Sequence, residues 1–129
     1  MLKPLRTLFR KAPAAPSAST PPGERFYAIG DIHGCDRLFE ALIEAIEADD
    51  AQAPEAKTTV VLLGDLVDRG PGSAQVIDAA RAWGKRRKVR YLAGNHEEMF
   101  LESFEDREVL KHFLKHGGRE TILSYGISK

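Results

Sequence analysis

Three segments of the sequence each place a side chain suited to metal binding directly after an apolar run and a glycine. They read FYAIGDIHG over residues 26–34, VVLLGDLVDRG over 60–70 and VRYLAGNHE over 89–97. Carboxylate and amide oxygens together with an imidazole nitrogen are donors that a divalent cation accepts. The candidate metal ligands in these segments are Asp31, His33, Asp65 and Asn95.

The spacing of these segments predicts the elements that position them. Asp31 and Asp65 are 34 residues apart, and Asp65 and Asn95 are 30 apart, so each interval suits one strand–helix–strand unit. Parallel strands joined in this way end at the same edge of a sheet. We therefore expect the side chains that follow the three strands to meet at that edge and to form a metal site.

Such a set can hold two cations, because Asp65 has two oxygens to share and Asn95 offers an amide oxygen to a second ion. Two cations about 3.5–4 Å apart generate hydroxide from water and clamp a phosphoryl group for in-line attack. The neighbouring His96 can then protonate the leaving oxygen, with Asp68 orienting its imidazole. Arg69 carries a planar guanidinium that suits phosphate oxygens.

Each motif alone has an ordinary structural explanation. An Asp-x-His pair occurs often by chance, a Gly-Asp after a strand is often only a turn, and an Asp-Arg pair is more often a surface ion pair. Three such motifs in order, each behind a predicted strand and at a suitable interval, favour the metal site over those explanations.

Hydrophobic patterning predicts an α/β fold. The predicted strands are Arg25–Gly30, Thr58–Leu63 and Lys88–Ala93. The predicted helices are Asp36–Ala48, Ser73–Trp83, one that begins at Glu97, Arg107–Lys115 and Arg119–Tyr125. Asp36 and Ser73 are predicted to be N-caps, and Trp83 and Phe104 are predicted to lie in the core.

The 129 residues fit one domain, and 19 basic and 19 acidic residues give no overall charge that would favour nucleic acid or membrane. Residues 1–24 are rich in alanine, proline and basic residues, and we expect a disordered tail there. A transit peptide or a membrane-surface anchor are the alternatives. A single cysteine, Cys35, and the lack of a membrane-length apolar run fit a cytoplasmic protein. We expect the basic cluster 85–88 to be a solvated loop.

The three motifs together resemble those of the calcineurin-like metallophosphoesterase superfamily. The sequence VDRG at 67–70 is similar to its phosphoprotein phosphatase branch, which includes bacterial serine/threonine protein phosphatases and symmetrical diadenosine tetraphosphate hydrolases. The resemblance covers roughly residues 25–104. It implies a two-sheet β-sandwich flanked by helices, of which residues 25–129 would form about the N-terminal half.

The resemblance also implies roles for the site residues and their cofactors. The implied metal ligands are Asp31, His33, Asp65 and Asn95, with Asp65 shared between two ions. The implied catalytic residues are His96, Asp68 and Arg69, and those implied to bind substrate phosphate are Arg69, Asn95 and His96. The cofactors would be two divalent ions, with Mn²⁺ preferred and iron or zinc as alternatives.

Two features differ from that branch. Its members carry two later histidine ligands, whereas only His112 and His116 follow the third motif here, too early to match and best interpreted as solvated helix surface. Ala93 stands where protein phosphatases commonly have a second phosphate-binding arginine. We therefore expect a fragment, a truncated chain or one half that needs a partner chain, with an apolar sheet face and a strand edge uncovered.

The predicted function is a metal-dependent phosphoesterase that hydrolyses phosphomonoesters by attack of a metal-bridging hydroxide, most similar to serine/threonine phosphoprotein phosphatases. The alternatives are a diadenosine tetraphosphate or other nucleotide hydrolase, and an inactive remnant that holds at most one metal. The expected partner is a phosphorylated protein or a nucleotide, and no specific nucleic-acid binding is expected.

Overall fold

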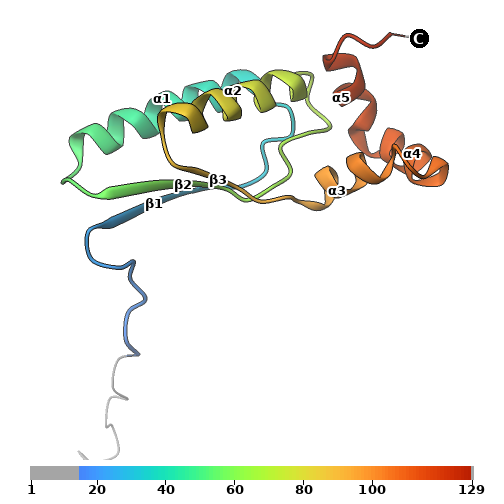
Figure 1. Cartoon of the computed structure of the whole chain (residues 1–129). Coiled ribbons are helices and arrows are strands. Elements are labelled where there is room, and N and C mark those ends of the chain that lie inside the picture. The colour runs from blue at the N-terminus through green and yellow to red at the C-terminus, as the bar shows by residue number, and fades with distance from the viewer. Residues whose placement is uncertain (1–14, 129) are drawn as a thin grey trace, which may run out of the picture.

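The computed structural model of this protein describes residues 15–128, whose strands form one parallel sheet. The strands, in their order across the sheet, are β1 (Glu24–Ile29), β2 (Lys57–Leu62) and β3 (Val89–Tyr91). The helical elements are α1 (Asp36–Gln52), α2 (Ser73–Arg86), α3 (Asn95–Glu102), α4 (Arg107–Phe113), the kinked π-helical turn η2 (Leu114–Gly118) and α5 (Arg119–Ser124). The predicted parallel βαβαβ unit followed by helices is confirmed (Figure 1).

The core lies between the sheet and helices α1 and α2, which both cover the same face (Figure 1). β2 is the central strand, and its Val60 and Leu62 are fully buried in the cluster formed with these helices. The rings of Phe39 on α1 and Trp83 on α2 meet edge to face, with their centroids 6.2 Å apart. Burial of these large apolar side chains stabilises the packing of the helices on the sheet. The predicted core position of Trp83 is confirmed.

The other face of the sheet is uncovered in the part of the chain that the structure describes. Successive side chains of a strand point to opposite faces, so every second residue points away from α1 and α2. Phe26, Leu63 and Leu92 lie on that side and are 43%, 50% and 51% exposed. The apolar face expected from the sequence is therefore present in residues 15–128.

Arg87, just after α2, ties the two helices together at the end of the sheet where the strands begin. Its guanidinium donates to Glu47 on α1 at 2.6 and 2.7 Å and to Asp50 on α1 at 2.8 Å. The hydrogen bond from Arg87 lowers the pKa of Glu47 to about 2. Hydrogen bonds from Thr58 and Arg25 lower the pKa of Asp50 to about 2. The predicted solvated loop over 85–88 is therefore wrong in part. Lys85 and Arg86 are exposed but belong to α2, and Arg87 is paired because α1 brings two carboxylates to it.

Three predictions of local detail are also wrong. Asp36 lies in the first turn of α1, where a negative charge is favourable, and Cys35 occupies the N-cap position without a side-chain hydrogen bond. Ser73 is the first residue of α2, and its buried hydroxyl accepts a hydrogen bond from the backbone of Asp68 instead of capping the helix. Phe104 is 71% exposed. Helix α3 ends two residues before it, so the buried face of that helix does not extend to Phe104.

Residues 1–14 of the predicted tail lie outside the described residues. Of the described remainder, 15–23 forms no helix or strand, whereas Glu24 is the first residue of β1. Within residues 15–128, every helix is too short or too polar to cross a membrane.

Candidate metal centre

The loops after β1 and β2 are joined by backbone hydrogen bonds that bring their metal-binding side chains together. The N–H groups of Ile32 and His33 both donate to the carbonyl oxygen of Asp65, at 3.0 and 2.9 Å. One donor atom from each of Asp31, His33 and Asp65 lies within 4.8 Å of the other two. Three of the four predicted ligands therefore meet at the edge of the sheet where the strands end.

His33 presents one ring nitrogen to this group because its other nitrogen is already engaged. Its Nδ1 lies 2.9 Å from the carbonyl oxygen of Val67, which can only accept, so Nδ1 carries the proton. In the neutral imidazole Nε2 is then free of a proton, and it lies 3.7 Å from Asp31 Oδ2. An imidazole held in this tautomer beside two carboxylates fits a divalent cation in both charge and donor type.

Four residues of the site adopt left-handed backbone conformations that residues other than glycine rarely take. The backbone angle φ is +44° at His33, +54° at Asp65, +73° at Asp68 and +72° at Arg69. Each such residue costs about 1–3 kcal/mol, so the rest of the fold must hold these loops in place. Hydrogen bonds from α3 and α5 do so.

Glu97 on α3 helps to hold these loops in place. This role was not predicted from the sequence. Its Oε2 accepts hydrogen bonds from the backbone N–H groups of Asp65 at 2.7 Å and Gly94 at 2.8 Å. Its Oε1 accepts from the N–H groups of Leu66 at 2.7 Å and Val67 at 3.2 Å. One carboxylate thus joins the loop after β2 to the start of α3. The sequence signals only the bond to Gly94, because a glutamate in the first turn of a helix can bond back to the N-cap backbone.

The close approach of α3 to the metal-binding group requires glycine at position 94. A Cβ atom at Gly94 would lie 2.1 Å from Asp65 Oδ1, which is far inside van der Waals contact. The backbone N–H of His96 donates to that same oxygen at 3.1 Å. The third motif therefore contacts the second through its backbone as well as through side chains.

His96 and Asp68 form a buried pair beside the metal-binding group. His96 Nδ1 lies 2.7 Å from Asp68 Oδ2, and Asp68 is fully buried. Because an ionised carboxylate only accepts hydrogen bonds, Nδ1 carries a proton, and Nε2 lies 3.4 Å from a guanidinium nitrogen of Arg69. The rings of His96 and His33 also meet, with centroids 4.7 Å apart. The partners expected from the sequence are in contact.

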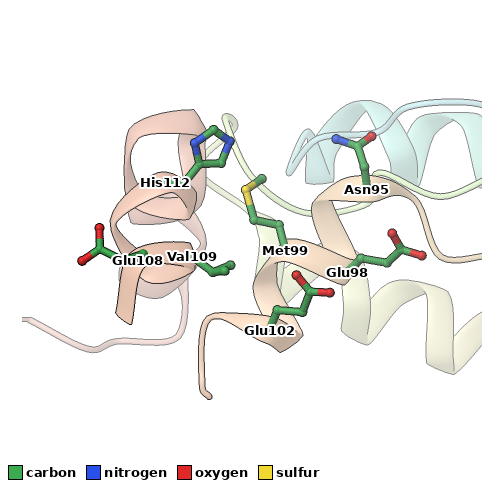
Figure 2. Close-up of a pocket in the computed structure, with 7 residues that line it drawn as sticks. All are labelled: Asn95, Glu98, Met99, Glu102, Glu108, Val109 and His112. Carbon is green, nitrogen blue, oxygen red and sulfur yellow. The ribbon is translucent and has the colours of Figure 1, made fainter. Parts of the chain in front are cut away.

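Asn95, the fourth predicted ligand, begins α3 and has an exposed side chain. It lines a cavity between α3 and α4 (Figure 2), together with Glu98, Met99, Glu102, Glu108, Val109 and His112. Figure 2 shows Asn95 and His112 on these two helices, on either side of the cavity. In the described part of the chain, the acidic and histidine residues of this cavity do not converge as the group after β1 and β2 does. His112 and His116 are both exposed.

The sequence matches the family model described as calcineurin-like phosphoesterase over residues 24–126. The chain belongs to this family. The match begins with β1 and continues through α5, so it includes every loop and helix of the site described above. The Asp31, His33 and Asp65 group lies within the residues that the calcineurin-like phosphoesterase model matches.

The curated relatives of this calcineurin-like phosphoesterase chain include bis(5'-nucleosyl)-tetraphosphatases. The symmetrical enzyme of Paracidovorax citrulli is 33% identical over 105 residues, which cover 77% of this chain and 35% of the relative. The asymmetrical enzyme PrpE of Geobacillus thermodenitrificans is 36% identical over 101 residues, which cover 75% of this chain and 40% of the relative. The chain thus spans two fifths or less of the length of these relatives. No solved structure matches it significantly.

Proposed function

We propose that the protein hydrolyses phosphoester or phosphoanhydride bonds of nucleotides with two bound divalent cations. The observation that carries this proposal is the group of Asp31, His33 and Asp65 within 4.8 Å of one another. Cations held there would supply activated water and neutralise the charge of a phosphoryl group. The mixed oxygen and nitrogen donors suit Mn²⁺, with iron or zinc as alternatives.

Each remaining side chain of the site has a proposed task. Asn95 would add an amide oxygen to a second cation, which Asp65 would share. Arg69 is exposed beside His96, a position that suits a guanidinium binding substrate phosphate. The Asp68 carboxylate accepts a hydrogen bond from His96 Nδ1 and so orients the imidazole, whose Nε2, when it carries a proton, can pass that proton to the leaving oxygen.

A nucleotide substrate is favoured over a phosphoprotein by two observations. The relatives at 33% and 36% identity are bis(5'-nucleosyl)-tetraphosphatases. Ala93 stands where the serine/threonine phosphatase pattern commonly has a phosphate-binding arginine. We further propose residues 25–129 as the phosphoesterase domain, and a cytoplasmic location on the basis of the single cysteine.

The direct test incubates the full chain and Mn²⁺ with diadenosine tetraphosphate and separates the products by ion-exchange chromatography. Symmetrical cleavage yields ADP alone, whereas asymmetrical cleavage yields AMP and ATP. Asp65→Asn should abolish hydrolysis, and Asp78→Asn, an exposed change on α2, should leave the rate unchanged. Full activity in Asp65→Asn would refute the assignment of the site. Faster phosphate release from a phosphoserine peptide would favour the phosphoprotein substrate instead.

A second candidate is a catalytically inert domain that holds one metal through Asp31, His33 and Asp65. Those three residues are the ones whose donor atoms converge, which is the observation in its favour. Isothermal titration of the full chain with Mn²⁺ separates the two candidates. Two ions per chain support the enzyme, whereas one ion and no hydrolysis support the inert domain.

A further inference from the structure

The short C-terminal helix α5 reaches back to the loop that carries Asp68, 53 residues earlier in the chain. Thr121 on α5 is fully buried and lies against this loop. Its hydroxyl oxygen accepts a hydrogen bond from the backbone N–H of Asp68 at 2.8 Å. The same hydroxyl lies 2.6 Å from Asp68 Oδ1, to which it donates its proton. Thr121 therefore binds both the backbone and the carboxylate of Asp68.

These contacts leave each oxygen of the buried Asp68 carboxylate with a different partner. Oδ1 accepts from Thr121 at 2.6 Å, and Oδ2 accepts from His96 Nδ1 at 2.7 Å. A buried carboxylate without partners is costly, so the two hydrogen bonds together determine how the carboxyl plane is turned. Ser73 Oγ lies 3.0 Å from the Thr121 hydroxyl and accepts a hydrogen bond from the same Asp68 N–H.

Neighbouring residues of the same C-terminal segment hold the backbone of this loop. Asp68 and Arg69 are consecutive left-handed residues, and the N–H of Arg69 donates to the carbonyl oxygen of Gly117 at 3.1 Å. Gly117 itself has φ of +99°, and a Cβ atom there would lie 2.6 Å from Arg69 N. The hydroxyl of Ser124 accepts from the N–H of Ala74 at the start of α2. Residues 117–124 thus contact the loop and the helix that follows it.

We propose that Thr121 is a positioning residue of the active site, which acts on His96 through Asp68. The proposal rests on the function proposed above. With Oδ1 bound to the Thr121 hydroxyl, Oδ2 is directed at His96 Nδ1 and keeps the proton on that nitrogen. Nε2 is thereby left facing Arg69, where proton transfer to a leaving group would take place.

The test compares Thr121→Val, which keeps the shape of the side chain but removes the hydroxyl, with Thr121→Ser, which keeps the hydroxyl. In the full chain without metal, ¹⁵N chemical shifts of labelled histidine report the tautomer of neutral His96, assigned with a His96→Gln variant. We expect the Nδ1-protonated form to dominate in the wild type and in Thr121→Ser. In Thr121→Val we expect both tautomers, because the carboxylate is no longer held.

Kinetics of the Mn²⁺-loaded chain give a second readout. We expect Thr121→Val to lower kcat at least tenfold with KM within about threefold, since the residue contacts neither a metal ligand nor substrate. Thr121→Ser should keep most of kcat, and both variants should bind as much Mn²⁺ as the wild type. A Thr121→Val variant with wild-type tautomer and wild-type kcat would overturn the proposal.

Two further comparisons cover an unfolded Thr121→Val variant and an inactive wild type. If Thr121→Val is unfolded by circular dichroism, Thr121→Ala and Thr121→Ser are compared, because these two side chains differ only by the hydroxyl. Equal tautomer populations in that pair would overturn the proposal, and a loss of the Nδ1-protonated form in Thr121→Ala alone would support it. If the wild type hydrolyses no substrate, the proposed function fails, while the metal-free tautomer measurement still decides the role of Thr121.

Discussion

Glu97→Gln tests whether a single carboxylate holds the metal-binding loop against α3. The change keeps the size of the side chain but replaces one carboxylate oxygen by an amide NH₂ group. One oxygen faces backbone N–H groups at 2.7 and 2.8 Å, and the other faces two at 2.7 and 3.2 Å. Whichever way the amide turns, two N–H donors then face another donor in place of an acceptor.

The expected loss of stability follows from those two broken interactions. A hydrogen bond to a charged group contributes about 1.5–3 kcal/mol, and partial exposure reduces this because water can replace the lost acceptor. Loss of two such bonds should lower the free energy of unfolding by about 2–4 kcal/mol, a large share of the roughly 5–15 kcal/mol typical of a domain. With a slope of about 2 kcal/mol per M, the middle of the usual range, the midpoint of urea unfolding should fall by about 1–2 M.

Urea unfolding followed by circular dichroism measures this change, and Mn²⁺ titration of the folded variant measures its effect on the site. We expect Mn²⁺ affinity to fall about 10–100-fold, because the loop that carries Asp65 is no longer held. Glu102→Gln, the same change at an exposed position of α3, should stay within about 0.5 kcal/mol of the wild type. A Glu97→Gln variant with wild-type midpoint and wild-type Mn²⁺ affinity would refute the reasoning.

Two other predictions concern packing and pH. Gly94→Ala should weaken Mn²⁺ binding at least tenfold. Gly30→Ala should leave Mn²⁺ affinity unchanged, because an added Cβ there meets nothing within 4 Å. Equal Mn²⁺ affinities of the two variants in a titration would contradict this prediction. Arg87→Met should lower unfolding free energy at neutral pH by about 1–2 kcal/mol, a figure reduced for solvent screening. Its carboxyl partners have pKa values of about 2, below their ordinary 4.5 and 3.8. Their stabilisation is therefore complete above about pH 4.5 and lost as the pH falls toward 2. Urea midpoints across that range should fall less steeply in the variant than in the wild type.

The sequence by itself determined the sheet and the meeting of its three motifs. Apolar runs of strand length separated by helical intervals specify parallel strands, and parallel strands end at one edge. That topology is sufficient to bring Asp31, His33 and Asp65 together and to set His96 beside them. The prediction needed only local periodicity and chain direction, which is why the details of packing did not affect it.

The tertiary structure alone decided which side chains hold that site in place. Glu97 bonds to the loop after β2, and Thr121 bonds to Asp68 across 53 residues. The tertiary structure also decided two features away from the site: Arg87 pairs with α1 at the opposite end of the sheet, and Phe104 is exposed beyond the end of α3. Each of these features depends on how two separate elements lie relative to one another. A residue pattern constrains only the element that carries it. The convergence of Asp31, His33 and Asp65 could therefore be predicted from spacing, but the hydrogen bonds that hold their loops in place could not.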